Sequence, residues 1–171
     1  MFKIYFIALA TFISLAGYSQ SPDNFIIKDE AVIWQKKFIS NEKVTETFEK
    51  VILSGILVDA KIQQNIVYGN MRDFHFDISR YDKKLSLLQR AWLSTRYGAY
   101  LTLEINGDKV IATIKKIGMY SSIESSPANS YSDWEIWTIK KGDRKQFSNN
   151  FSDTLRFIIN NEFTRMLNPL F

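Results

Sequence analysis

Apolar and polar residues alternate with a period of two in several segments of the chain, which is the pattern of half-buried β-strands. In residues 31–39, for example, Val32, Trp34 and Phe38 share one face, while Gln35 lies on the other. The same alternation predicts further strands over residues 73–78, 100–105, 110–117 and, as a short edge strand, 134–139.

Two connections between these strands can be predicted from local residues. Asn106-Gly107-Asp108 stands between two alternating apolar runs. Asn-Gly in that position is typical of a tight hairpin, because both residues tolerate a positive φ. Residues 56–62 and 65–70 form either the two strands of a hairpin around Gln63-Gln64 or one strand with a bulge.

Two other segments have the 3.6-residue period of amphipathic helices, residues 42–54 and 152–167. Their apolar positions are Val44, Phe48, Val51 and Ile52 in the first, and Leu155, Ile159, Phe163, Met166 and Leu167 in the second. The expected caps are Ser40 or Asn41 and Ser152 or Asp153, and the expected stops are Gly55 and Pro169. Weaker helical spacing over 82–92 is compatible with a short third helix.

The order of these elements is a strand, a helix, four or five antiparallel strands and a terminal helix. Two amphipathic helices and a sheet with one apolar face bury each other's apolar surface. The pattern therefore predicts an α+β fold, a two-layer sandwich in which both helices pack on one face of an antiparallel sheet.

The N-terminus has the composition of a secretory signal peptide. Lys3 precedes an apolar run over 4–15, and small residues follow. The run is shorter than the roughly 20 residues of a membrane-spanning helix. We expect cleavage after Ala16 or, by preference, after Ser19, so that residues 1–19 form the leader; the alternative is an uncleaved membrane anchor. The remaining residues, 20–171, then form one exported domain, periplasmic or extracellular, with no integral membrane segment.

Composition narrows the chemistry of this domain. The 171 residues are 46% hydrophobic and 15% aromatic, which suits one globular domain. There is no cysteine, so disulfides, thiolate metal sites and cysteine nucleophiles are excluded. His75 is the only histidine, which excludes mechanisms that need two imidazoles. A serine-rich stretch over 121–132 predicts a surface loop.

The basic residues do not indicate a nucleic-acid partner. The net charge is +4, and many of the lysines occur in separated pairs: Lys36-Lys37, Lys83-Lys84, Lys115-Lys116 and Lys140-Lys141. Nucleic-acid binding requires charge clustered on one face. We therefore interpret the pairs as solvated strand ends and loops.

Two groups of residues are candidates for chemistry. Asp73, His75 and Asp77 alternate on one strand face and are acceptable metal ligands or an acid–base group, but a solvent-facing stripe explains them better. We therefore predict no catalytic, cofactor-binding or metal site. The candidate binding residues are Tyr131, Trp134 and Trp137, whose rings would stack on a sugar if exposed. The alternative, which large aromatics favour, is that they cover the core.

The chain resembles a family of secreted bacterial domains of unknown function with a TATA-binding-protein-like fold. The matching features are the leader, VIWQKKF over 32–38 with the helix that follows, the hairpin LTLEINGDKVIATI over 101–114 and the closing helix. The resemblance covers roughly residues 27–167. One departure is Val110-Ile111 after the hairpin, where the family is expected to have an arginine or an aromatic pair. The resemblance implies a fold and an exported location, and no activity or ligand.

These observations predict an exported, non-enzymatic binding or interaction domain with no cofactor, whose partner is a protein or a small-molecule ligand of the cell envelope. The first alternative is a structural subunit of an envelope assembly, which would add a partner strand at an exposed sheet edge. The second is a hydrolase of unfamiliar design.

Overall fold

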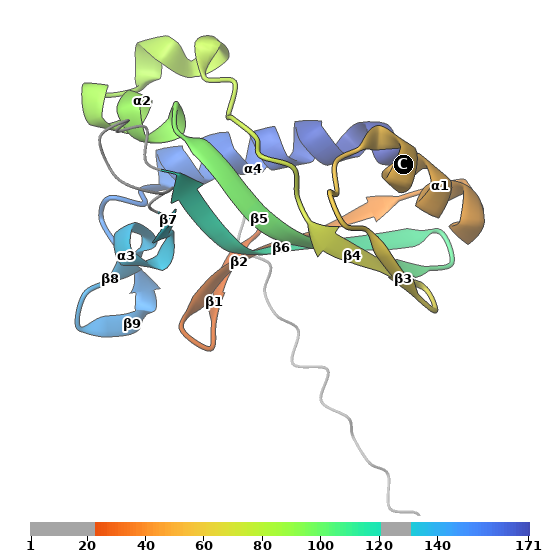
Figure 1. The fold of residues 1–171 in the computed structure, drawn as a ribbon. Helices are drawn as coiled ribbons and strands as arrows, with labels where there is room; N and C mark the ends of the chain where they lie inside the picture. The colour runs from red at the N-terminus through yellow and green to blue at the C-terminus, as the bar shows by residue number, and fades with distance from the viewer. Residues whose placement is uncertain (1–22, 121–130) are drawn as a thin grey trace, which may run out of the picture.

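An antiparallel sheet organises the molecule. The structure, a computed structural model, describes residues 23–120 and 131–171. In these residues seven strands form one sheet in the order β1-β2-β6-β5-β4-β3, with β7 paired to β6, and β8 and β9 form a separate ladder (Figure 1). The strands are β1 (Phe25–Lys28), β2 (Ala31–Ile39), β3 (Lys61–Gln63), β4 (Ile66–Asn70), β5 (Arg96–Asn106), β6 (Lys109–Tyr120), β7 (Tyr131–Asp133), β8 (Ile139–Lys140) and β9 (Asp143–Phe147).

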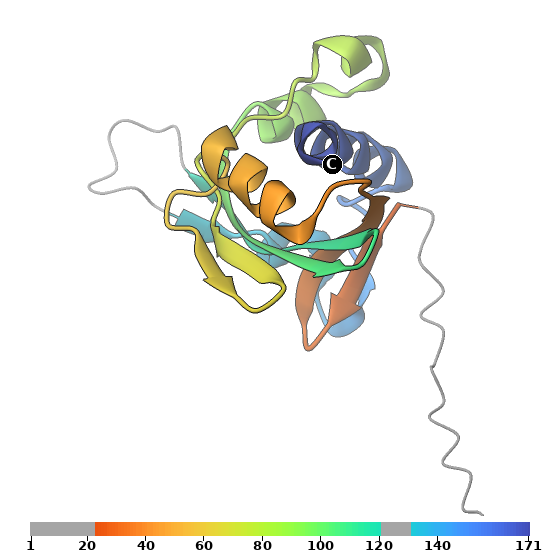
Figure 2. The same cartoon turned by 90° about the vertical axis from the view of Figure 1, so that its right-hand side faces the viewer.

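The two long helices, α1 and α4, lie on the same face of this sheet (Figure 2). The helices are α1 (Val44–Ser54), α2 (Leu87–Leu93), α3 (Glu135–Thr138) and α4 (Asp153–Leu167), with 3₁₀ turns η1 (Ser79–Lys84) and η2 (Asn168–Leu170). The two-layer α+β sandwich predicted from the sequence is therefore the observed architecture.

The core lies between the sheet and these helices. Val32 and Trp34 of β2 are fully buried, and the Trp34 ring centroid lies 5.4 Å from that of Phe163 in α4. Phe38, further along β2, packs on the C-terminal Phe171 with ring centroids 4.8 Å apart. The predicted inward face of β2 is thus confirmed.

Some of the helix termini are those predicted from the sequence, and one is not. Gly55 ends α1 with φ +65°, and Ser152 caps α4 by accepting a hydrogen bond from the Leu155 N–H, both as predicted. The cap of α1 is different: Lys43 is the N-cap, and its N–H donates to the Glu46 carboxylate. Ser40, predicted as a cap, is instead buried before the helix.

The apolar stripe of α1 is also narrower than predicted. Phe48 and Val51 are buried, and Thr47 is buried beside them. Ile52 is 47% exposed, because it faces away from the sheet along with Leu53. The prediction that Ile52 belongs to the core was therefore wrong, and Thr47 is buried instead.

Both predicted hairpins are present. The β5–β6 turn consists of Gly107-Asp108, because Asn106 is already paired with Lys109, and only Gly107 has a positive φ, +64°. The β3–β4 pair confirms the hairpin alternative, but β3 begins only at Lys61, so residues 56–60 of the predicted strand are not part of it. The turn is Gln64-Asn65, with φ +54° at Gln64.

Two predicted strands are not strands. Residues 73–78 alternate in burial, yet they make only one bridge, from Phe74 to Tyr97, so no ladder forms. Residues 134–139 form the single-turn helix α3 and enter β8 only at Ile139. The Trp137 N–H and the Thr138 N–H both donate to the Trp134 carbonyl, which closes the turn.

The serine-rich stretch predicted as a loop falls mostly on residues 121–130, which lie outside the described residues. Its last two residues, 131–132, belong to β7 and pair with β6. The sequence pattern does not predict β1, β7 or β9 as strands, and it predicts β8 only at Ile139.

A β-bulge interrupts β6 at the point where it leaves β2. Buried side chains occur at Val110, Ala112 and Ile114 and then at Ile117, a step of three instead of two. The pairing with β5 shifts here, between Gly98 and Tyr100, and Lys116 has φ +52°. Bulges of this kind change the direction in which neighbouring side chains point.

Candidate functional site

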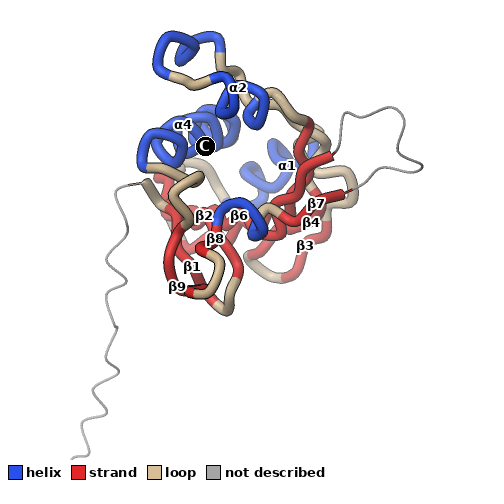
Figure 3. Tube along the Cα trace, turned by 90° about the vertical axis from the view of Figure 1, so that its left-hand side faces the viewer, coloured by secondary structure: helices blue, strands red, loops and turns tan. Residues whose placement is uncertain are grey.

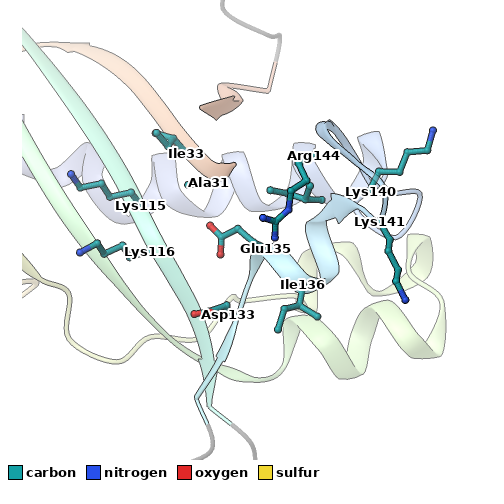
Figure 4. A pocket seen from close by; sticks show the side chains of 12 residues that line it. Ala31, Ile33, Lys115, Lys116, Asp133, Glu135, Ile136, Lys140, Lys141 and Arg144 are labelled. Atoms are coloured by element: carbon teal, nitrogen blue, oxygen red, sulfur yellow. The ribbon is translucent and has the colours of Figure 1, made fainter. Parts of the chain in front are cut away.

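A cleft of about 840 Å³ lies between the end of the main sheet and the segment that contains α3, β8 and β9 (Figure 4). We call it the basic cleft. β2 and β6 form one wall, and α3 with the β8–β9 hairpin forms the other. The hairpin lies next to β1 (Figure 3), and α1 lies toward the opposite end of the molecule (Figure 1).

Five basic side chains surround this cleft: Lys115, Lys116, Lys140, Lys141 and Arg144. The described lining holds only two acidic side chains, Asp133 and Glu135. In Figure 4 the lysines of β6 and those of the hairpin stand at opposite ends. Two of the lysine pairs interpreted as solvated strand ends and loops therefore flank a common cleft, and their ammonium groups point outward from its two ends.

The bulge in β6 explains how two consecutive lysines reach one wall. The ammonium groups of Lys115 and Lys116 lie 5.5 Å and 6.0 Å from the centroid of the same ring, that of Tyr100. In a regular strand, successive side chains point to opposite faces. The positive φ of Lys116 removes that alternation.

The floor of the cleft is apolar. Ala31 and Ile33 come from β2, and Ile136 and Ile139 come from α3 and β8. Ile136 is 69% exposed, and Figure 4 shows it at the side of the cleft opposite the β2 residues. The site thus combines an apolar floor with a cationic rim.

Glu135, one of the two acidic residues of the lining, holds the wall in place. The Val32 N–H donates to Glu135 Oε1 at 3.2 Å, which ties α3 to β2. Arg144 forms an ion pair with Glu30 in the β1–β2 turn, and Lys140 Nζ lies 3.3 Å from Gln146 Oε1. Lys141 is exposed and makes no ion pair with a described residue.

A second pocket of about 400 Å³ lies on the other side of α3, and we call it the tryptophan pocket. Trp92 and Leu88 of α2, Trp137 of α3 and Leu155 of α4 form its apolar part. Asn149 and Asn150 form part of its polar rim, and no described residue that lines it carries a charge.

The three aromatic candidates have different environments. Trp134 is fully buried, with its ring centroid 4.7 Å from that of Trp92 and 5.6 Å from that of Phe151, so it covers the core and cannot stack on a ligand. Trp137 is 47% exposed and lines the tryptophan pocket. Tyr131 lies in β7, and its side chain is outside the described part of the structure.

The Asp73, His75 and Asp77 stripe does not converge. The Asp73 carboxylate lies 3.4 Å from Arg96 Nε, and Asp77 accepts hydrogen bonds from the hydroxyl and backbone N–H of Ser79. Those hydrogen bonds lower the pKa of Asp77. Within residues 23–120 and 131–171, no three potential ligand side chains form a metal-binding group.

Tyrosine ionisation is suppressed on both sides of the sheet. Burial raises the pKa of Tyr97, whose hydroxyl donates to the Trp92 carbonyl in the core. Partial desolvation, with smaller contributions from Tyr68 and Asp59, raises the pKa of Tyr100 beside the two lysines. Tyr100 is therefore a neutral ring next to two cations at physiological pH.

Among the described helices, none has the length and apolar character needed to cross a membrane.

Comparisons with known proteins give fold likenesses only. No family model matches the chain, and no curated protein matches it. A solved structure described as a TBP-like protein from Parabacteroides distasonis aligns with 8% identity and a TM-score of 0.46, over 84% of this chain and 89% of that chain. A DUF4468 family protein from Bacteroides ovatus aligns with 12% identity and a TM-score of 0.37, over 84% and 83%. Neither description names a ligand.

Proposed function

We propose that this protein is an exported, non-enzymatic binding domain whose basic cleft holds an anionic ligand with an apolar part. The observation that carries the proposal is the position of Lys115-Lys116 and Lys140-Lys141 at the two ends of an apolar floor. Clefts lined by one sign of charge concentrate ligands of the opposite sign. Apolar lining with a few placed polar groups is typical of small-molecule sites.

Export is proposed from the leader over residues 1–19, and it directs the search for a ligand to the cell envelope. Expressed with its leader, the protein should mature to a species that begins near Gln20 and leaves the cytoplasm. Intact-mass measurement of the exported fraction tests this. Recovery of the unprocessed chain, Met1 to Phe171, in a membrane pellet would contradict export.

The binding proposal is tested with two probes that share one apolar chain, octyl phosphate and octyl glucoside, below their micellar concentrations. Calorimetry should detect binding of octyl phosphate and much weaker binding of octyl glucoside. The affinity for octyl phosphate should fall as the salt concentration rises, since salt screens exposed charges. Equal binding of both probes would contradict a role for charge.

A charge-reversed variant tests whether octyl phosphate binds in the basic cleft. Lys140→Glu with Lys141→Glu should weaken octyl phosphate binding about tenfold or more, because it replaces two rim cations by anions. The control is Lys43→Glu with Lys109→Glu, which changes the net charge equally at exposed positions away from the cleft. Equal losses in both variants would mean that the net charge matters and the cleft does not.

The two alternatives receive less support from the described residues. The outer strands of the sheet, β1 and β3, have four and three residues, and β9 lies against β1. Short edges that carry a lysine, as Lys61 in β3, disfavour addition of a partner strand. For a hydrolase, the carboxylates nearest His75 in the sequence are turned to Arg96 and Ser79.

A further inference from the structure

We propose that the tryptophan pocket is a second binding site, separate from the basic cleft, and that it takes a neutral oligosaccharide. Its volume of about 400 Å³ lies within the range of about 300–1,000 Å³ that small-molecule sites occupy. α2, α3 and the beginning of α4 form it, and these elements gather at one end of the molecule (Figure 1).

The apolar part of the pocket is aromatic and partly open. Trp137 is 47% exposed and Leu88 is 76% exposed, whereas Leu155 belongs to the core. The pocket therefore reaches from the surface to the core of the sandwich. Trp92 is held in place because its ring packs on the buried Trp134, with centroids 4.7 Å apart. A large aromatic face presented in this way is a surface for the apolar face of a flat ring.

The polar rim supplies amide groups without charge. Asn149 and Asn150 are exposed, and their side chains make no hydrogen bond with any described residue. Each amide offers two donors and an acceptor. Ser86 and Gln89, across the pocket, are already paired with each other's backbone N–H in the cap of α2, so they hold its shape.

Charge decides the ligand class. No described lining residue is ionised, so a charged ligand entering the pocket would lose hydration without gaining an ion pair. A sugar matches the lining, because its ring presents C–H groups on one face and hydroxyl groups around the edge. The tryptophan rings would pack on the C–H groups, and the asparagine amides would form hydrogen bonds with the hydroxyl groups.

α3 separates this site from the basic cleft. Ile136 lines the cleft, and the next residue, Trp137, lines the tryptophan pocket. The two residues are exposed on the same single-turn helix, so either one can be truncated without opening the core. They form a matched pair for a test.

The test uses the mature protein and six neutral hexasaccharides: malto-, cello-, chito-, manno-, xylo- and laminarihexaose, the chito sugar being N-acetylated. Saturation-transfer NMR and calorimetry should detect at least one of them. Trp137→Ala should weaken that interaction about tenfold or more, which is about 1.4 kcal/mol. Ile136→Ala should change it less than twofold, and circular dichroism verifies that both variants fold.

Two further measurements complete the test. Lys140→Glu with Lys141→Glu should leave the sugar affinity within twofold, so failure of the anion site and failure of the sugar site are distinguishable. Absence of binding by all six sugars at about 10 mM, or binding that Trp137→Ala does not weaken, overturns the proposal. Self-association that Trp137→Ala abolishes would also overturn it, because the pocket would then be an interface between copies.

Discussion

At the scale of the residue, Lys116 both has a strained backbone conformation and lines the basic cleft. It has φ +52° without being glycine, and it lines the cleft beside Lys115. The sequence contains a signal for the bulge, because the apolar alternation changes parity between Ile114 and Ile117. It contains no signal for the lysines across the cleft, because their placement depends on the packing of α3 and the β8–β9 hairpin, which belong to a separate segment of the chain, residues 135–147.

The strain can be tested by replacing Lys116 with glycine. A non-glycine residue in the left-handed region destabilises the folded state by about 1–2 kcal/mol. Glycine avoids this cost, but its greater freedom in the unfolded chain destabilises the folded state by about 0.5–1 kcal/mol. Lys116→Gly should therefore stabilise the protein by about 0.5–1 kcal/mol in urea unfolding while weakening octyl phosphate binding. Lys115→Gly removes the same charge from an extended position and should destabilise. Destabilisation by both would show that the bulge is not strained.

A second residue-scale prediction concerns Asn160 in α4, which is 9% exposed. Its side-chain oxygen accepts hydrogen bonds from Trp34 Nε1 at 2.9 Å and from Asn24 Nδ2 at 2.8 Å. Asn160→Ala leaves the buried indole donor without a partner, so it should cost about 1–3 kcal/mol in thermal unfolding. Asn161→Ala, on the neighbouring half-buried position, should change stability by less than about 0.5 kcal/mol. Equal effects would contradict the network.

At the scale of the element, long periodic segments were predictable and short ones were not. β2, β5, β6 and α4 each repeat their pattern over nine or more residues. Residues 134–139 alternate like a strand, yet burial of Trp134 and the closing hydrogen bonds to its carbonyl make a helical turn. β9 reads Asp-Arg-Lys-Gln-Phe, which has no apolar alternation, so only its pairing with β8 identifies it.

The packing of the two long helices on the sheet predicts the result of truncating their inward phenylalanines. Phe48 in α1 is 7% exposed and Phe163 in α4 is fully buried against Trp34. Phe48→Ala and Phe163→Ala should each cost about 3–5 kcal/mol, because each opens a cavity. Glu49→Ala, on the exposed face of α1, is the control. If both phenylalanine variants melt like the wild type, the helices do not cover the sheet.

The stability of the protein should depend on pH through Asp59, because its carboxylate is hydrogen-bonded to Asn70 at the end of β4. Its carboxylate accepts hydrogen bonds from the Asn70 N–H at 2.7 Å and from Asn70 Nδ2 at 2.9 Å, and the former is the main reason that its pKa is lowered. A lowered folded-state pKa means that the stabilisation is present above about pH 4 and is lost as pH falls below it. Asp59→Asn should therefore destabilise at pH 6 and have less effect at pH 2, measured by urea unfolding. An equal effect at both pH values would contradict the role of the charge.

At the scale of the whole molecule, aromatic contacts join the cleft segment, which contains α3, β8 and β9, to the main sandwich. Trp134 lies 5.6 Å from Phe151, Phe151 lies 5.1 Å from Phe25, and Phe25 lies 6.4 Å from Phe163, measured between ring centroids. Phe163 in turn packs on Trp34. Both candidate sites are therefore attached to a single core, and the segment that bears α3 is not an independent unit.

A continuous core predicts that both ends of the molecule unfold together, as single domains of about this size usually do. The indole N–H signals of Trp34, in the sandwich, and Trp134, beside the cleft, report separately on the two ends in NMR. In a urea titration their native signals should disappear with midpoints within about 0.3 M of each other, because the rings between them transmit the loss of packing. Phe151→Ala removes one link of the chain and should lower both midpoints together. Loss of the Trp134 signal at clearly lower urea than that of Trp34 would instead mean that the segment with α3, β8 and β9 opens on its own, and one wall of each site would then belong to a part of the protein that folds separately.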